Sequence, residues 1–179
     1  MKSTLLIFFC LFSLLSTQAL AETRMGFGAG WSYCDQTKCN EERPGGDLTI
    51  DTVQWQLEQR LTRDLYLQAR ADINFWMHES YGLHLKYVFP NAYSENRHVG
   101  FYLRGGIQYY EVDLDRLNFL TSREKEKYDG FSYSIGAGWQ YYTARSWGFS
   151  AELFYTDLDH FQSYGTMLTL SYRFGNSRF

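Results

Sequence analysis

The segment formed by residues 164–174 alternates large apolar residues with small or polar ones. Its large side chains share one parity: Tyr164, Leu168, Leu170, Tyr172 and Phe174. The small or polar side chains have the opposite parity: Gly165, Thr169, Ser171 and Arg173. Successive side chains of a β-strand point to opposite faces, so one face of this segment would be apolar. A period of two with aromatic residues near both ends is typical of a strand that crosses a membrane within a barrel.

Seven further segments repeat this alternation, with an apolar parity that is nearly free of charge. They are residues 24–33, 48–61, 65–75, 81–89, 99–111, 131–141 and 147–155. Segments of roughly 9 to 13 residues suit tilted membrane strands, and no apolar run after residue 21 reaches the length of a spanning helix. Lipid cannot satisfy an open sheet edge, so the strands must close on themselves. The sequence predicts an all-β fold: an eight-stranded antiparallel transmembrane β-barrel.

The alternative fold is a soluble β-sandwich or a lipocalin-like barrel, whose apolar parity would pack inward. A polar face in water would account for Arg70 and Glu152. Against this, aromatic residues make up 19% of the chain, and glycine and serine stand opposite many of them. Small residues suit the narrow interior of an eight-stranded barrel, which only side chains can fill. The membrane barrel is therefore the favoured interpretation.

Residues 1–21 have the features of a secretory signal peptide. Lys2 provides the positive charge, residues 5–15 are apolar, and Ala19-Leu20-Ala21 is a small-x-small cleavage site. The stretch is too short for a membrane anchor. We expect cleavage before Glu22, which leaves residues 22–179 as one outer-membrane barrel domain.

The connections between the predicted strands alternate in size. Short or intermediate ones are residues 62–64, 90–98 and 143–146, and the opposite end carries residues 34–47, 76–80, 112–129 and 158–162. Bacterial barrels keep short turns in the periplasm and longer loops outside. The third of the expected outer loops contains the charged run 123–127.

Three segments and the end of the last predicted strand carry a family resemblance: residues 100–110, 136–141 and 151–158, and the ending Leu170-Ser171-Tyr172-Arg173-Phe174. The three segments resemble successive strands of the OmpA/OmpX-like family of small outer-membrane β-barrels, and the ending is similar to the closing strand of that family. The resemblance implies a bacterial outer-membrane location and contact with outer-membrane lipid, lipopolysaccharide and the barrel-assembly machinery. It also implies an assembly signal formed by Leu168, Leu170, Tyr172 and Phe174, although the chain continues to Phe179, which could serve as the terminal aromatic instead.

Cys34 and Cys39 are the two cysteines that follow the signal. A close pair in an exported chain most simply forms a disulfide, here one that would tie the first outer loop. A metal site is the alternative, but no histidine lies nearby and a structural zinc site needs four ligands.

Charged residues on the inward parity predict a network in the barrel lumen. Arg70, Arg104 and Glu152 fall near mid-depth. Four more lie towards the periplasmic end: Glu58, Arg60, Lys86 and Arg173. Charges in a narrow lumen must be paired or hydrated, so we expect Glu152 to pair with Arg104 or Arg70. The network could close the barrel as a polar core, or it could form a gate for small solutes.

Neither a catalytic site nor a cofactor site is indicated. His160, Ser163 and Asp157 or Asp159 could meet only in a loop, and His84 should point into the lumen as a hydrogen-bonded structural residue. Asp113-Leu114-Asp115 and Asp157-Leu158-Asp159 provide too few oxygens for calcium, so no metal is expected. The net charge of −3 argues against a nucleic-acid partner.

These observations favour a non-catalytic outer-membrane protein with a structural or surface-interaction role, of the adhesin or resistance type that the resemblance implies. Contact with a host or envelope protein would occur through the extracellular loops, where binding residues usually lie. The alternatives are a lipid A-modifying barrel enzyme and a narrow pore for small solutes.

Overall fold

The computed structural model describes residues 22–34, 51–75, 78–89, 99–113, 127–143, 146–158 and 161–174. Within these ranges the chain forms eight β-strands. No helix in the described part is long and apolar enough to cross a membrane. The strands are β1 (Thr23–Cys34), β2 (Thr52–Arg60), β3 (Leu65–Asn74), β4 (His78–Val88), β5 (Val99–Asp113), β6 (Lys127–Tyr142), β7 (Trp147–Leu158) and β8 (Phe161–Phe174).

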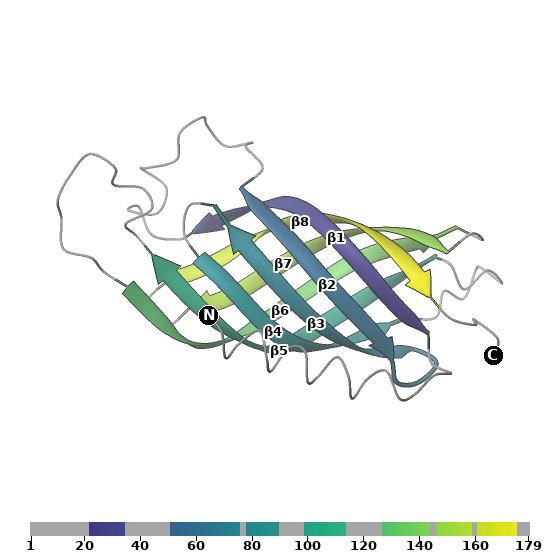
Figure 1. The fold of residues 1–179 in the computed structure, drawn as a ribbon. Helices are drawn as coiled ribbons and strands as arrows, with labels where there is room; N and C mark the ends of the chain where they lie inside the picture. The colour runs from purple at the N-terminus through teal and green to yellow at the C-terminus, as the bar shows by residue number, and fades with distance from the viewer. Residues whose placement is uncertain are drawn as a thin grey trace.

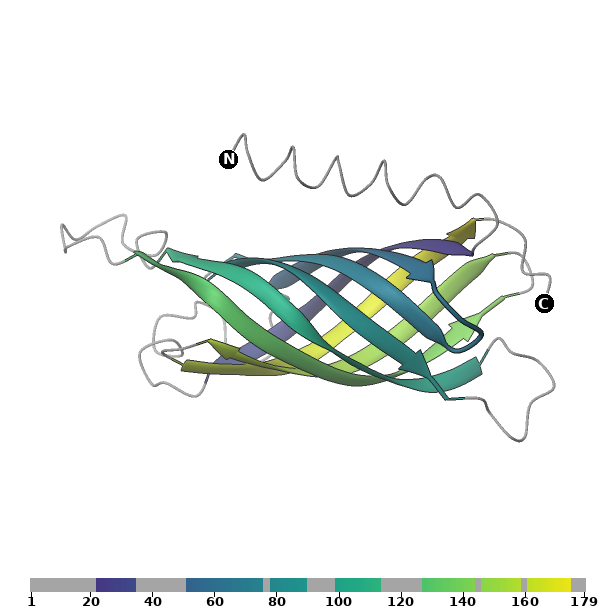
Figure 2. The ribbon, with the colours of Figure 1, turned by 90° about the horizontal axis from the view of Figure 1, so that it is seen from below.

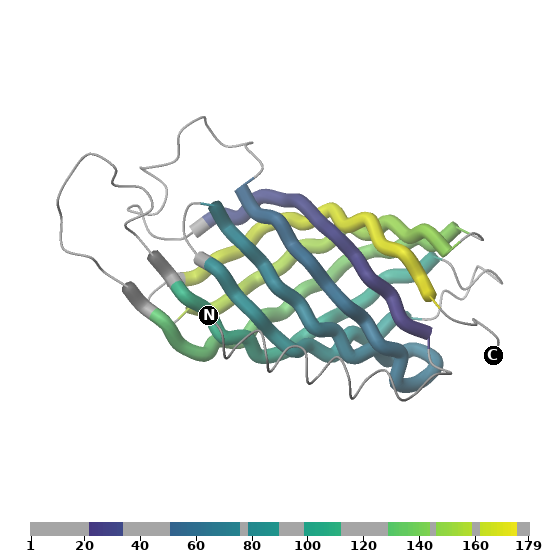
Figure 3. Tube along the Cα trace, viewed as in Figure 1, coloured from purple at the N-terminus to yellow at the C-terminus, as the bar shows by residue number. Residues whose placement is uncertain are grey.

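The eight strands form one closed antiparallel barrel in chain order, which confirms the predicted fold class (Figure 1). β8 returns to β1, and their ladder runs from the pair Thr23 and Phe174 to the pair Cys34 and Ser163. The strands are strongly tilted about the barrel (Figure 3). The chain enters β1 and leaves β8 at the same end, where the short β2–β3 turn also lies (Figures 1 and 2). We call this the turn end and the opposite one the loop end.

The outside of the barrel is apolar. Leu153 is 64% exposed near the middle of β7, and Phe131 is 73% exposed towards the loop end of β6. Neighbouring outward rings touch one another, as in the edge-to-face pair of Trp147 and Tyr172, whose centroids lie 5.1 Å apart. The outer surface is thus formed by the residues of the apolar parity that the sequence analysis identified.

The inside is polar, and its long side chains lie over glycines of adjacent strands. Tyr102 on β5 covers Gly138 on β6, where a Cβ atom would lie 2.5 Å from the Tyr102 Cζ. The carboxylate of Glu152 lies over Gly136 in the same way, 3.0 Å from a Cβ placed there. Glycine on β6 therefore makes the room that the large inward groups of β5 and β7 occupy.

The strands extend further at the loop end than the sequence predicted. β4 begins at His78 instead of residue 81, β5 ends at Asp113 instead of 111, and β6 begins at Lys127 instead of 131. Likewise β7 continues to Leu158 and β8 begins at Phe161. Residues 112, 113 and 127–129 of the expected third outer loop, and residues 158, 161 and 162 of the expected fourth, therefore belong to strands. The backbone ladder continues past the apolar belt, where outward positions become acidic: Glu79 pairs with Glu111, and Glu111 with Asp129. Hydrophobic alternation therefore ends before strand pairing does.

Smaller differences affect the second and third strands. β2 runs from Thr52 to Arg60, where the sequence predicted residues 48–61. Residues 48–50 lie outside the described ranges, and Asp51 and Leu61 are not part of the strand. β3 ends one residue before Phe75, whose backbone N–H donates to the carbonyl of Asp51 at 2.8 Å. This bond extends the pairing of the two segments by one step beyond Thr52 and Asn74.

Candidate functional site

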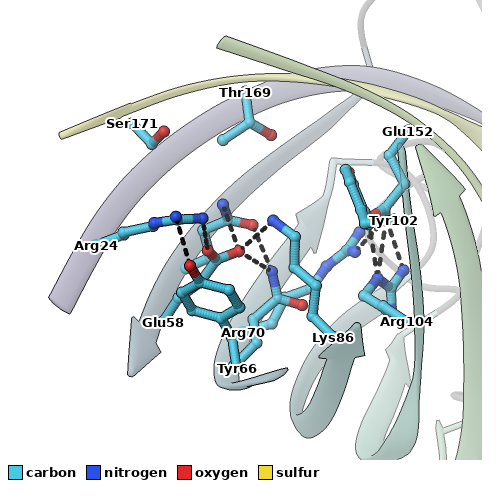
Figure 4. Close-up of polar contacts among 12 residues, drawn as sticks. Arg24, Glu58, Tyr66, Arg70, Lys86, Tyr102, Arg104, Glu152, Thr169 and Ser171 are labelled. Carbon is cyan, nitrogen blue, oxygen red and sulfur yellow. Dashed lines mark hydrogen bonds and ion pairs between the residues drawn. The ribbon is translucent and has the colours of Figure 1, made fainter. Parts of the chain in front are cut away.

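The mid-lumen cluster consists of charged and aromatic side chains from β3, β5 and β7: Arg70, Asp72, Tyr102, Arg104 and Glu152. Figure 4 labels all of them except Asp72. All are buried, and each reaches the lumen because it has the inward parity of its strand. Glu152 is the centre of the cluster, because the other strands direct their donors at its carboxylate.

Glu152 accepts hydrogen bonds from two guanidinium groups. Arg70 Nη1 lies 2.7 Å from Glu152 Oε1, and Arg104 Nη2 lies 2.8 Å from the same oxygen. Arg104 Nε is 3.0 and 3.1 Å from the two carboxylate oxygens. The geometry therefore joins Glu152 to Arg70 and to Arg104 together, where the sequence analysis expected one or the other.

The remaining donors of this cluster are also used. Tyr102 donates its hydroxyl to Glu152 Oε2 at 3.0 Å, and Arg104 Nη1 donates to Ser134 Oγ at 3.0 Å. Arg70 Nε lies 2.7 Å from both carboxylate oxygens of Asp72. The guanidinium groups of Arg70 and Arg104 thus face the carboxylates of Asp72 and Glu152. Buried ionised groups are tolerated where their charges are paired in this way.

The turn-end cluster lies nearer the short turns: Glu22, Arg24, Glu58, Tyr66, Gln68 and Lys86 (Figure 4 draws most of it). Lys86 Nζ donates to Glu58 Oε1 at 2.7 Å. Gln68 Nε2 donates to the same oxygen at 3.0 Å and to Gln56 Oε1 at 2.8 Å. Glu58 therefore accepts from side chains on two other strands, and its exposure is 0%.

Arg24 closes the turn-end cluster against aromatic rings. Its guanidinium carbon lies 4.2 Å from the ring centroid of Tyr66 and 4.2 Å from that of Tyr142. Arg24 Nε also donates to Glu22 Oε1 at 2.6 Å, and Nη1 is 3.6 Å from Glu58 Oε2. A cation held between two rings with a carboxylate at its edge combines two attractive interactions.

The other two predicted lumen charges, Arg60 and Arg173, lie at the periphery of this cluster. Arg60 Nη1 is 3.3 Å from Glu22 Oε2, and its other nitrogens donate to the carbonyls of Thr62 and Arg63 in the β2–β3 turn. Arg173 is half-buried, with its guanidinium 5.9 Å from the Tyr142 ring centroid. Arg60 thus ties the turn to the lumen, while Arg173 lies at the edge.

The two clusters meet at Tyr102. Its ring lies 4.1 Å from Lys86 Nζ, and its hydroxyl bonds to Glu152. The lumen is thus crossed by paired charges at two depths. Such an arrangement obstructs the interior with side chains that cannot move without separating buried ions, which is costly.

A separate group of polar residues fixes the loop end of β1, β2 and β3. Asp51 Oδ1 accepts from the Ser32 backbone N–H at 3.0 Å and from the Thr52 hydroxyl at 2.7 Å. Asn74 Nδ2 donates to the Ser32 hydroxyl at 2.8 Å and to the Thr52 hydroxyl at 3.0 Å. Ser32 and Asp51, which lie on either side of the first outer segment, are therefore joined at the same rim.

Sequence reasoning missed several members of the two clusters. Glu22 and Arg24 precede or begin the first segment, and Asp72 lies at an inward position of the third, residues 65–75. Tyr66, Tyr102 and Tyr142 were also missed, although each has the parity of a known inward residue on its strand, as Tyr102 has with Arg104. That shared parity was the available signal. The ring of tyrosine is largely apolar, so these three residues did not stand out as members of the polar inward face.

Some predicted features fall at or beyond the limits of the described residues. Cys34 ends β1, but its side chain and Cys39 lie outside the description. The same holds for residues 1–21, residues 123–126 of the charged run, the side chain of Lys127, His160, Asp159 and Phe179. The proposed assembly residues Leu168, Leu170, Tyr172 and Phe174 all lie on the exposed outer face of β8. Phe174 pairs with Thr23 as the last residue of that strand.

Among the described residues, no group of three or more His, Cys, Asp or Glu side chains is arranged to hold a metal ion. Ser163 lies inside the barrel on β8, opposite Thr156 of β7. His84 points into the lumen as expected, yet neither of its ring nitrogens has a hydrogen-bond partner in the described part of the chain. The expectation of a hydrogen-bonded His84 is therefore wrong for the described contacts.

A closed eight-stranded barrel with an apolar exterior and an interior of paired charges defines the class of small outer-membrane β-barrel proteins. The comparison with protein families agrees: the sequence pattern of the outer membrane protein beta-barrel domain matches residues 7–174. The chain belongs to this family, and its place is the bacterial outer membrane. A search of curated protein sequences finds no match.

Three solved structures illustrate the likeness in fold. The N-terminal β-barrel domain of Pseudomonas aeruginosa OprF has a TM-score of 0.64 at 14% identity, covering 87% of this chain and 98% of that one. Neisserial surface protein A has a TM-score of 0.58 at 11% identity, with coverages of 86% and 97%. Ail, the attachment invasion locus protein of Yersinia pestis, has a TM-score of 0.56 at 17% identity, with coverages of 87% and 99%. At these identities the likeness concerns the fold.

Proposed function

We propose that this protein is a non-catalytic outer-membrane scaffold that acts through the segments at its loop end, with its turn end in the periplasm. The observation that supports the proposal is that ion pairs fill the lumen at two depths. Glu152 is bound there by Arg70 and Arg104, and Glu58 by Lys86. An interior filled by paired side chains leaves little room for a ligand inside the barrel. Recognition would then be left to residues 35–50 and 114–126, which connect rigid strands.

The fold comparison offers a first ligand to test. One of the structurally similar proteins, Ail, has been solved in complex with the heparin analogue sucrose octasulfate. We propose that the loop end of the present protein likewise contacts a host or envelope molecule. Exposed loops on a rigid barrel tolerate such specialisation without cost to the fold.

The test compares the wild type with a variant in which residues 114–126 are replaced by a short Gly-Ser linker. A matched control shortens the turn-end connection, residues 90–98, in the same manner. Binding to host cells, serum proteins and immobilised heparin is measured on whole bacteria. We expect the loop-end variant to lose the interaction and the turn-end variant to keep it. Equal binding by all three proteins would refute the role of this loop.

Three associated features complete the proposal. We propose cleavage after Ala21, a disulfide between Cys34 and Cys39, and partners that include lipopolysaccharide and the barrel-assembly machinery. Intact mass measured with and without reduction tests the first two. Replacing both cysteines with serine should reduce binding if the disulfide shapes the first outer segment, and should leave barrel stability nearly unchanged.

A pore is the second candidate, because the clusters that fill the lumen are polar and could separate into an open state. It predicts stepwise conductance in a planar bilayer that changes when Arg104 or Glu152 is replaced. An enzyme acting on lipid A predicts an altered lipid A mass in cells that express the protein. The scaffold proposal expects neither result.

A further inference from the structure

Arginine and tyrosine side chains alternate across the turn end of the lumen. The guanidinium carbon of Arg24 lies 4.2 Å from the ring centroid of Tyr66 and 4.2 Å from that of Tyr142. Each ring also has a second arginine near it. The guanidinium carbon of Arg60 lies 6.0 Å from the Tyr66 centroid, and that of Arg173 lies 5.9 Å from the Tyr142 centroid. Three cations are thus gathered around two aromatic rings at one end of the barrel.

Two carboxylates of the turn-end cluster pair with three cations. Glu22 Oε1 lies 2.6 Å from Arg24 Nε, and Glu22 Oε2 lies 3.3 Å from Arg60 Nη1. Glu58 Oε1 lies 2.7 Å from Lys86 Nζ, and Glu58 Oε2 lies 3.6 Å from Arg24 Nη1. Two negative charges therefore balance at most two of these three cations, and the excess charge of the cluster is positive.

Arg173 adds a fourth cation at this end, and it forms no ion pair within the part of the chain that the structure describes. Its side chain is half-buried and has the inward parity of β8, and its backbone N–H donates to the Ser146 carbonyl at 2.8 Å. Arg24 is its direct partner in the β1–β8 ladder. Like charges at directly paired positions repel, and burying a charge without a counter-charge is costly. An anion beside Arg173 would offset both effects.

We propose that the turn end of the lumen binds a soluble oxyanion of the phosphate class at Arg173, within the positive potential of Arg24 and Arg60. A guanidinium group binds phosphate oxygens through two parallel hydrogen bonds. Cations gathered at the mouth of a low-dielectric channel also concentrate anions there.

The direction of the Arg173 side chain favours a soluble ligand over the phosphate of a lipid. Arg173 has the inward parity, whereas its neighbours Tyr172 and Phe174 lie on the outer face. The ligand therefore enters from the water at the turn end, which is the periplasmic side in the proposed orientation. The site is independent of the loop-end segments, so its presence or absence does not bear on their role.

The test adds inorganic phosphate to the full mature chain in micelles of a detergent without phosphate groups, with chloride holding the ionic strength constant. Urea unfolding measures the folding constant. A ligand that binds only the folded state raises this constant by about tenfold when its concentration is about ten times its Kd. We expect this rise in the wild type and none in Arg173→Gln. No rise in the wild type, or an equal rise in the variant, would overturn the proposal.

Arg63→Gln is the matched control. Arg63 lies in the β2–β3 turn at the same end of the barrel, and its side chain is exposed. Its replacement changes the net charge by the same amount as Arg173→Gln, and the response to phosphate should remain that of the wild type. A response lost equally in the two variants would show attraction by overall charge, without a site at Arg173, and would contradict the proposal.

A lipid arm separates the two sources of phosphate. Phosphatidylglycerol is added to the same micelles in place of inorganic phosphate, again at constant ionic strength. Stabilisation by this lipid without a response to inorganic phosphate would assign Arg173 to a lipid headgroup and would overturn the soluble ligand.

If Arg173→Gln does not fold, magnetic resonance of the wild type decides the question. The side-chain Nε–H resonance of Arg173 should shift as inorganic phosphate is added, and that of Arg63 should stay in place. An unchanged Arg173 resonance would end the proposal.

Discussion

Lys86 and Arg104 lie directly opposite each other across the β4–β5 ladder, and both point into the lumen. Like charges at directly paired positions repel. Each cation is held by a different carboxylate, Lys86 by Glu58 at 2.7 Å and Arg104 by Glu152 at 2.8 Å. The interior therefore depends on its carboxylates more than on any single cation, and this dependence can be measured.

Replacing Glu152 with glutamine should destabilise the barrel strongly. The substitution leaves Arg70 and Arg104 close together without their shared carboxylate, at an expected cost of about 3–5 kcal/mol if the site is dry. The free energy of unfolding in urea and lipid vesicles is the measurement. Glu111→Gln is the matched control, because Glu111 is exposed on the outer face and exposed charges contribute about 0–1 kcal/mol. Similar costs for the two variants would contradict the role of Glu152.

Removing both members of the Glu58–Lys86 pair should lower the free energy of unfolding less than removing Glu58 alone. Glu58→Gln leaves Lys86 beside Arg104 without its 2.7 Å partner. We expect the double variant Glu58→Gln with Lys86→Met to be more stable than Glu58→Gln alone, because it removes the uncompensated buried charge. A double-mutant cycle on the unfolding free energy measures the coupling. A double variant less stable than both single variants would exclude this explanation.

A methyl group at Gly138 should disrupt the contact between β5 and β6. A Cβ there would lie 2.5 Å from Tyr102 Cζ and 2.5 Å from the carbonyl oxygen of Ala151. Because the backbone oxygen cannot yield easily, Gly138→Ala should cost about 1–3 kcal/mol. Gly105→Ala is the control on the lipid side, since its nearest neighbour, Ile135 Cγ2, would be 3.8 Å away. That variant should be neutral or slightly stabilising, and thermal stability in detergent distinguishes the two.

An arginine at the apolar exterior should be penalised according to depth. Leu153→Arg places a charge near the middle of β7 and should cost about 2–4 kcal/mol. Phe131→Arg, nearer the loop end, should cost only about 0–1 kcal/mol from the charge itself. Folding into vesicles of defined lipid reports both values. Equal costs would show that Leu153 does not lie at the centre of the membrane.

The alternation of the sequence was sufficient to predict eight strands and the parity of each strand that faces outward, although the inward tyrosines were not recognised. It placed Arg70, Arg104 and Glu152 inside because parity alone decides that question. Parity does not determine which inward residues meet, because that depends on the register of each ladder and on closure between β1 and β8. For this reason the joint binding of Glu152 by two arginines was not foreseen.

The ends of the strands were harder to predict for a different reason. Hydrophobic alternation reports contact with lipid, whereas backbone pairing continues wherever two strands remain adjacent. At Glu79, Glu111 and Asp129 the ladder persists after the apolar signal has ended. The sequence pattern therefore indicates how far the apolar belt extends along each strand, and it does not indicate where the strand ends.

The ladder between β1 and β8 has a consequence for the order of assembly. Every other pair of strands is consecutive in the chain, so its two members can pair without the rest of the sheet. The edge of β1, by contrast, finds its partner only when β8, the last strand, has joined the sheet. Until then the growing sheet has two exposed edges that can pair with other chains. A barrel of this topology must therefore be protected during export, and its closing step is slow relative to the formation of its hairpins.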